Sequence, residues 1–165
     1  MIGHFIHALW RRIAPISHAR AIGVRMGEGC RLIDVTFSTE PYLVTLGNRV
    51  SASGTHFETH DGGVWVLRER YPDLDRIAPI TVGDNVFIGH GTVILPGVTI
   101  GSNVVIGAGA IVSRDIPSDS VAAGVPARVI GTLADYRDKA LAEGVMTKAL
   151  NGRQKREAVL ARLAR

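Results

Sequence analysis

An apolar residue returns every six positions through the middle of this chain, from residue 82 to residue 117. Divided into sixes, the segment reads VGDNVF, IGHGTV, ILPGVT, IGSNVV, IGAGAI and VSRDIP, and its first position is always valine or isoleucine. A period of six matches neither an amphipathic helix nor an alternating strand. It predicts a solenoid in which short, flat strands are separated by tight turns.

The geometry of such a solenoid assigns a role to several positions of the repeat. Three sides of six residues close one coil of about eighteen residues, and the first and fifth positions point inward to stack on neighbouring coils. Glycine stands at the second position in four of the six repeats. We expect it to relieve crowding at turns, where a positive φ costs glycine nothing. The same repeat is present at residues 46–57 and more weakly at residues 26–37.

The composition agrees with one folded domain. Of the 165 residues, 46% are apolar and 21% are charged, which is typical of a globular protein rather than a disordered one. Aromatic residues make up 5%, so a large aromatic core is not expected. The single cysteine, Cys30, excludes an internal disulfide bond and indicates a reducing compartment. It falls at an inward fifth position, where we interpret it as part of the core.

Residues 1–20 precede the repeat and have apolar residues at helical spacing. We expect a short helix that caps the first coil. A cleaved signal peptide is a poor interpretation, because two histidines interrupt the apolar part and the arginines follow it. Binding to a membrane surface is the alternative, since Arg11, Arg12 and Arg20 accompany the apolar face. Co-sedimentation with anionic liposomes separates the two interpretations.

Residues 132–165 are expected to form a helical tail with a break at Asn151-Gly152. The net charge of +4 is modest, and most of it is carried by the last fifteen residues. A nucleic-acid-binding protein would need a basic face interleaved with aromatic residues, so that class is not expected. No apolar run is long enough to cross a bilayer, and we expect a cytoplasmic protein or one peripheral to the membrane.

The repeat resembles that of the hexapeptide-repeat acyltransferases, which fold as left-handed parallel β-helices. The segment from ITVGDNVF to GVPARVIG, residues 80–131, is similar to the C-terminal part of the maltose and galactoside O-acetyltransferases. The stretches FSTEPYLVTLGNRV and FETHDGGVW resemble the branch that modifies capsule, exopolysaccharide or lipopolysaccharide sugars. The resemblance implies an all-β solenoid over residues 21–131, with helical segments at both ends.

The repeat stops at the sequence FETHDGGVWVLRERYPDLDRIAP, residues 57–79. A solenoid can extrude a loop from one corner without disturbing its coils, and we expect such a loop at about residues 61–79. In the resembled family this loop reaches the neighbouring subunit of a trimer, and the catalytic histidine stands at its start. Thr59-His60 occupies that place. The imidazole, with a pKa near 6.5, suits a general base that deprotonates an attacking hydroxyl.

A carboxylate on the other ring nitrogen would fix the tautomer of His60. Glu58 and Asp61 are its nearest acidic neighbours in sequence, and the sequence does not decide between them. Further acceptor contacts are expected from Asp61, Trp65 and Arg68 on the loop, although Trp65 equally fits a role in packing the loop onto the coils. Glu40 resembles the position of an acidic acceptor-binding residue in the sugar acetyltransferases.

The resemblance also implies a groove for acetyl-CoA between adjacent β-helices. The positions that match the family are Ala108 in IGAGA, Ser113-Arg114 in VSRD, where a Thr-Lys pair is usual, and Arg128 in GVPARVI. His90 stands beside the expected pantetheine path, where a small residue is usual. The galactoside-type enzymes carry a further basic residue three positions after Arg128, and this chain departs from them with Gly131.

His90 also raises a rival class, the γ-class carbonic anhydrases, which bind zinc through three histidines on the same fold. His56 and His90 match two of these positions, but Leu95 stands at the third, and two ligands do not make a catalytic zinc site. We therefore expect no metal. A non-catalytic scaffold and an N-acetyltransferase that acts on amino or nucleotide sugars remain alternatives. The leading prediction is a homotrimeric sugar O-acetyltransferase that transfers an acetyl group directly, with His60 as the base.

Overall fold

The computed structural model describes residues 9–164, and up to residue 133 the chain winds into a parallel β-helix with three sheets. We name the sheets A, B and C. Sheet A contains β1 (Arg25–Met26), β4 (Val44–Leu46), β7 (Ile80–Val82) and β10 (Thr99–Ile100). Sheet B contains β2 (Arg31–Ile33), β5 (Ser51–Ser53), β8 (Val86–Ile88), β11 (Val104–Ile106), β13 (Ser120–Gly124) and β14 (Ala127–Thr132). Sheet C contains β3 (Thr36–Phe37), β6 (His56–Phe57), β9 (Val93–Ile94) and β12 (Ile111–Val112).

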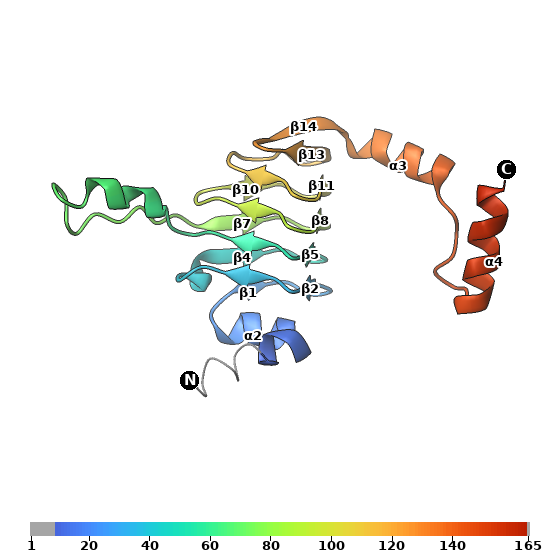
Figure 1. The fold of residues 1–165 in the computed structure, drawn as a ribbon, viewed down its shortest axis with the longest axis horizontal. Helices are drawn as coiled ribbons and strands as arrows, with labels where there is room; N and C mark the ends of the chain where they lie inside the picture. Colours follow the sequence, from blue (N-terminus) through green and yellow to red (C-terminus); the bar gives the residue numbers. More distant parts are fainter. Residues whose placement is uncertain (1–8, 165) are drawn as a thin grey trace. The chain divides into compact units, whose positions relative to one another are not determined.

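The pairing of strands confirms the predicted coil. Each complete coil visits sheets A, B and C in turn, and in the C-terminal half a strand pairs in parallel with the strand eighteen residues later, as Thr81 does with Thr99 and Phe87 with Val105. Figure 1 shows the strands of sheet A, and beside them those of sheet B, stacked one above another in chain order. An antiparallel hairpin of β13 and β14 closes the C-terminal end of sheet B. The last parallel strand of this sheet, β13, is therefore paired with the strand that follows it in the chain.

The core of the β-helix is the inner column that the repeat predicts. Every first and fifth position from residue 82 to residue 116 is buried, and Ile88, Ile94 and Ile106 are 0% exposed. Burial of each valine or isoleucine in this column contributes about 1.5–3 kcal/mol. Because each coil buries its column only against its neighbours, this contribution depends on the stacking of successive coils.

The earlier coils depart from a strict period of six. Ala52 and Phe57 both point inward but are five residues apart, whereas their partners Ile88 and Ile94 are six apart. The buried residue between them is Thr55 at the fourth position, not His56 at the fifth. The expectation of an inward fifth position is therefore wrong here. The missing residue turns His56 to the outer face of sheet C.

Glycine is required at the second position for a different reason from the positive φ that we expected. Gly89 does not have a positive φ. A Cβ atom there would lie 2.4 Å from the backbone nitrogen of Ala108 in the next coil, so glycine is required by the close approach of two coils. The positive φ values lie elsewhere in the turns, for example at Gly91 and at Asn85.

The interruption of the repeat is an extruded loop, drawn in green in Figure 1. It leaves the helix between β6 and β7, at the corner where sheet C leads to sheet A, and its first part is the 3-10 helix η2 (Gly62–Leu67). Backbone hydrogen bonds from Asp61 to Arg76 and from Ala78 to Thr59 hold its two ends together. The predicted loop is thus confirmed, and its base is a rigid part of the β-helix.

The segment before the first coil is helical, as predicted, over residues 9–13 and again in α2 (Pro15–Ala21). Residues 1–8 of the expected cap lie outside the described residues. Ala19 of α2 is 1% exposed and joins the core at the N-terminal end of the β-helix. Beyond residue 133 the chain forms a separate unit with α3 (Leu133–Glu143) and α4 (Gly152–Leu163). The predicted break is present, and Asn151 caps α4 through a reciprocal hydrogen bond with Gln154.

Candidate active site

His60 and Glu40 lie at the same corner of the β-helix in successive coils. Glu40 follows β3 and precedes the 3-10 helix η1 (Pro41–Leu43), and His60 follows β6, one coil later. Since β3 and β6 pair in parallel with Thr36 opposite His56, segments twenty residues apart in sequence become neighbours. The corner thus places the carboxylate of Glu40 next to His60, at the point where the repeat stops.

The strand geometry of β6 sorts the side chains around His60. Successive residues of a strand point to opposite faces. Phe57 and Thr59 point inward and are 0% exposed, whereas His56, Glu58 and His60 are only partly buried on the outer face. Three ionisable side chains therefore stand in a row on one surface.

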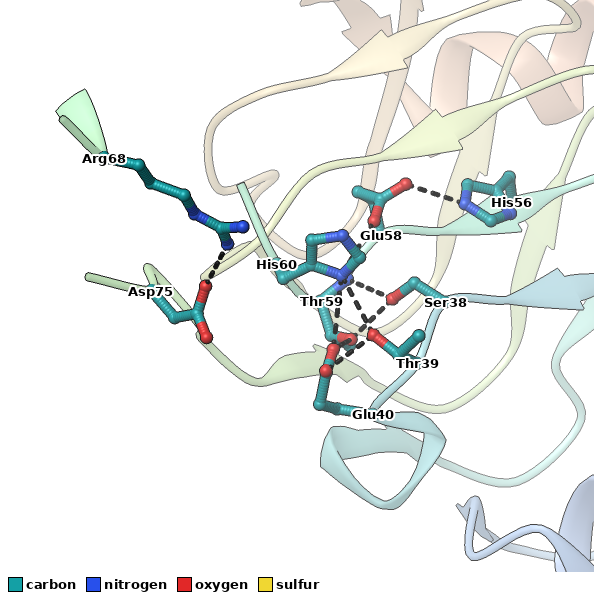
Figure 2. A network of polar contacts seen from close by, with 9 residues as sticks. All are labelled: Ser38, Thr39, Glu40, His56, Glu58, Thr59, His60, Arg68 and Asp75. Atoms are coloured by element: carbon teal, nitrogen blue, oxygen red, sulfur yellow. Dashed lines mark hydrogen bonds and ion pairs between the residues drawn. The ribbon is translucent and has the colours of Figure 1, made fainter. Parts of the chain in front are cut away.

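Nδ1 of His60 faces three oxygen atoms, as Figure 2 shows. These are Oε2 of Glu40, Oε1 of Glu58 and Oγ1 of Thr39, each 3.3 Å from Nδ1. Glu58, one of the two orienting residues that the sequence left open, is thus at the ring, and Glu40 joins it from the preceding coil.

These contacts define the tautomer of His60. The hydroxyl of Thr39 has one proton and donates it to Oε1 of Glu40 at 2.6 Å. Its contact with His60 must then be donated by Nδ1–H, because the remaining hydroxyl sites and both carboxylates only accept. Within residues 9–164, the hydrogen bond and ion pairs of the His60 ring all involve Nδ1. In the neutral ring the lone pair is then on Nε2, as a general base requires.

A chain of hydroxyl groups holds Glu40 in its ionised form. The Ser38 hydroxyl contacts Oγ1 of Thr59 at 2.6 Å, and the Thr59 hydroxyl donates to Oε2 of Glu40 at 2.9 Å. The pKa of Glu40 is lowered from its ordinary value of 4.5, chiefly by the hydrogen bond from Thr39 and further by Thr59 and His60, against desolvation. Its oxygens are occupied by these groups, which favours a role in holding His60 over direct contact with an acceptor.

Asp61, the other acidic neighbour that the sequence left open, pairs with groups of the loop rather than with Nδ1 of His60. Its carboxylate pairs with Arg76 at 2.7 Å and accepts from the backbone N–H of Gly63 at 2.9 Å, which caps η2. The hydrogen bond from Arg76 is the main cause that lowers the pKa of Asp61. Asp61 thus connects the two ends of the loop, and of the two candidates Glu58 is the one that lies at Nδ1.

A cavity of about 390 Å³ opens beside His60. It is lined by Glu58, His60, Asp61, Gly62, Arg76, Leu95, Pro96 and Ser113. Of the positions expected to bind acetyl-CoA, Ser113 thus lies beside the candidate base, with the exposed Arg114 next in sequence. This cavity joins residues from both sides of the repeat break.

The other expected cofactor positions lie elsewhere on the same chain. His90 and Ala108 are exposed in the turns that lead from sheet B to sheet C, at the edge of sheet C opposite to His60. Arg128 is exposed on β14 of sheet B, where its Nη1 donates to the carbonyl of Ala127 at 2.8 Å. One β-helix by itself does not bring these residues to His60.

The expected acceptor residues of the loop are also not at the ring. Trp65 is 72% exposed on η2, so the interpretation that it packs the loop onto the coils of its own chain is wrong. Arg68 pairs with Asp75 across the loop at 2.9 Å, and Figure 2 shows this pair apart from the His60 cluster.

Sequence reasoning missed the roles of Ser38, Thr39 and His56. Ser38 and Thr39 stand beside Glu40 in FSTEPY, so a stacking of that motif on the FETHD motif would have found them. His56 was considered only as a metal ligand. In the part of the chain that the structure describes, no group of three or more His, Cys, Asp or Glu side chains is arranged to hold a metal ion. No helix among these residues is long and apolar enough to span a membrane.

Comparison with known proteins defines the class. The family model for the bacterial transferase hexapeptide (six repeats) matches residues 79–114. A solved galactoside acetyltransferase in complex with coenzyme A superposes with a TM-score of 0.59 and 32% identity, over 83% of this chain and 81% of that chain. The chain therefore belongs to the hexapeptide-repeat acyltransferases, and the predicted left-handed parallel β-helix is confirmed.

Relatives of known sequence agree with this assignment. Protein CapG of Staphylococcus aureus is 47% identical over 152 residues, which cover 90% of this chain and 88% of CapG. The galactoside O-acetyltransferase of Escherichia coli (strain K12) is 66% identical over 110 residues, which cover 61% of this chain and 49% of that enzyme. The chain is thus an acyltransferase, and the alternative of a non-catalytic scaffold is not supported.

Proposed function

We propose that this enzyme transfers the acetyl group of acetyl-CoA to a sugar hydroxyl, in the synthesis of a surface polysaccharide. The observation that carries the proposal is that Nδ1 of His60 is the protonated nitrogen of a residue that lines a cavity together with Ser113. The names of the galactoside acetyltransferases support the acceptor class and the donor. The motifs around Glu40 and His60 support the polysaccharide context through their resemblance to the capsule and exopolysaccharide branch.

The geometry supports direct transfer in one displacement. Nε2 of His60 accepts the proton of the sugar hydroxyl while the oxygen of that hydroxyl forms a bond to the carbonyl carbon of the acetyl group. The carbon–sulfur bond breaks, and the thiolate that leaves takes the proton back from His60. During the step His60 is an imidazolium, whose Nδ1–H faces the carboxylates of Glu40 and Glu58 at 3.3 Å. No acyl-enzyme is required, and Cys30 has no role in it.

The acetyl-CoA site requires residues from two copies of the chain. Ser113 and Arg114 lie near His60, but His90, Ala108 and Arg128 lie on other edges of the β-helix. We propose that a homotrimer brings these two sets together in the groove between adjacent β-helices, with Arg128 near the phosphates, because arginine grips phosphate through paired hydrogen bonds. A cytoplasmic location, with peripheral contact of residues 1–20 with the membrane, completes the proposal.

The test is thiol release from acetyl-CoA with a panel of sugars and nucleotide sugars. We expect acceptor-dependent turnover that falls about 100-fold or more in His60→Ala, because a general base contributes at least that factor. Coenzyme A should bind the variant as it binds the wild type. Lys148→Ala, exposed between α3 and α4, is the matched control and should retain full activity.

Two outcomes would contradict the proposal. Equal rates for wild type and His60→Ala would remove His60 from the mechanism. Turnover with amino groups of amino sugars but with no hydroxyl acceptor would replace O-acetylation with N-acetylation.

A further inference from the structure

Glu58 lies between two imidazole rings on the outer face of β6. Its Oε2 is 2.8 Å from Nε2 of His56, and its Oε1 is 3.3 Å from Nδ1 of His60. Oε1 is buried and has no hydrogen-bond partner among the described residues. A buried carboxylate oxygen is costly without a donor, and the Nδ1–H group of His60 is the donor within reach. Glu58 is thus shared by two histidines.

The contacts of His56 show that it donates a hydrogen bond to Glu58. A carboxylate only accepts, so Nε2 of His56 carries a proton and donates it to Oε2. Nδ1 of His56 is 2.8 Å from Oγ1 of Thr36 on the paired strand β3. The ring is therefore held at both nitrogens, and it holds Glu58 with one oxygen turned toward His60.

Two negative charges face the same nitrogen of His60. Each negative charge within about 4–6 Å raises the proton affinity of an imidazole. Glu40 and Glu58 both lie 3.3 Å from Nδ1, and an imidazole that stays protonated at neutral pH does not act as a base. The hydrogen bond that His56 donates to Oε2 of Glu58 offsets part of the negative charge of this carboxylate.

We propose that the His56–Glu58 pair positions His60 and sets its proton affinity, with Glu58 raising it and His56 limiting that effect. The proposal rests on the proposed role of His60 as the general base. His56 acts only through Glu58, as a positioning residue. The loss of one residue between Ala52 and Phe57 is what turns His56 outward to this place.

The remaining charges around the pair are few. Glu40 faces His60 from the preceding coil, and Asp61 and Arg76 at the base of the loop pair with each other at 2.7 Å. The next two coils contribute Val93 opposite His56, and Leu95 and Ser113 in the cavity, none of which is charged. Arg114, next to Ser113, is charged and exposed. The His56–Glu58 pair is therefore the part of this environment that variants can change without breaking the base of the loop.

The experiment is the pH profile of kcat/KM, whose acid limb reports the protonation of His60 in the free enzyme. Glu58→Gln removes a negative charge, so the limb should move to lower pH by about one unit. His56→Leu removes the donor and leaves the charge of Glu58 uncompensated, so the limb should move to higher pH. His56→Gln retains a donor without the ring and should lie between His56→Leu and wild type.

The double variant isolates the coupling. In the Glu58→Gln background, His56→Leu should produce no further shift, because His56 acts through the carboxylate. Acid limbs that coincide in all variants would overturn the proposal. A shift by His56→Leu that persists without Glu58 would also overturn it.

Histidine-labelled NMR of the full-length protein gives the protonation of His60 without any substrate. We expect the variants to move the pH at which His60 titrates in the same directions as the acid limb of kcat/KM. If His60→Ala retains wild-type turnover while the NMR shifts appear, the proposed function fails and the coupling stands. If His60→Ala is inactive while the NMR titration of His60 is unchanged by every variant, the coupling fails and the proposed function stands.

Discussion

Around Glu40, single hydrogen atoms decide the chemistry of the neighbouring histidine. Thr39 and Thr59 each donate their only hydroxyl proton to this carboxylate. Because Thr39 also contacts Nδ1 of His60, that nitrogen must be the donor in their contact. Nε2 is then free to accept. Thr39 thus fixes the orientation of the histidine, and Thr59 acts on the carboxylate beside it.

The lowered pKa of Glu40 predicts a pH-dependent stability. Because the folded state holds Glu40 ionised, its contribution is fully present above the ordinary value of 4.5 and is lost as the pH falls through the lowered folded-state pKa. Glu40→Gln should therefore reduce the Tm at pH 7, and the difference from wild type should disappear in acid. Glu69→Gln, exposed on the loop, is the control. A Tm difference that stays constant down to pH 2 would contradict this account.

The turns of the coil are the elements that decide how closely neighbouring coils approach. A Cβ atom at Gly89 would meet backbone atoms of Gly107 and Ala108, the nearest at 2.4 Å, and at Gly101 the backbone of Ser118 lies equally in the way. Backbone atoms cannot move aside without separating the coils. The second-position glycines are therefore a condition for parallel pairing.

Gly89→Ala should destabilise the protein by about 1–3 kcal/mol, the usual cost of overpacking. Thermal or denaturant unfolding measures this change. Gly131→Ala is the matched control, because Gly131 has no positive φ and a Cβ atom there meets nothing within 4 Å. Equal stabilities of the two variants would show that the coils separate at no cost and would refute the packing argument.

The whole β-helix carries an apolar loop that its own coils do not cover. Trp65 and Val66 are 72% and 74% exposed, and Leu67 and Ile77 are also exposed. Monomeric proteins rarely expose apolar side chains that gather in one place. This surface, together with the separation of His60 from His90 and Arg128, supports a trimer in which the loop packs on a neighbouring subunit.

Light scattering should therefore give about three times the 17.7 kDa of one chain. The double variant Trp65→Ser/Val66→Ser should lower the mass and the acetyl transfer together. Leu163→Ser, which replaces a side chain that is 77% exposed on α4, should change neither. A wild-type monomer at working concentration, or a variant that stays trimeric and active, would argue against the shared site.

The sequence by itself determined the solenoid, its inner column and the loop at the repeat break, because a period of six leaves one arrangement that buries every first and fifth position. It also singled out His60, through its place at the repeat break and the resemblance of Thr59-His60 to the family's motif. Only the tertiary structure decided what surrounds the ring. Glu40 and Thr39 reach His60 because coils stack residues twenty positions apart, and Asp61, its sequence neighbour, turns to Arg76. His56 points outward because the segment from Ala52 to Phe57 is one residue shorter than a regular repeat, which the period of six does not predict.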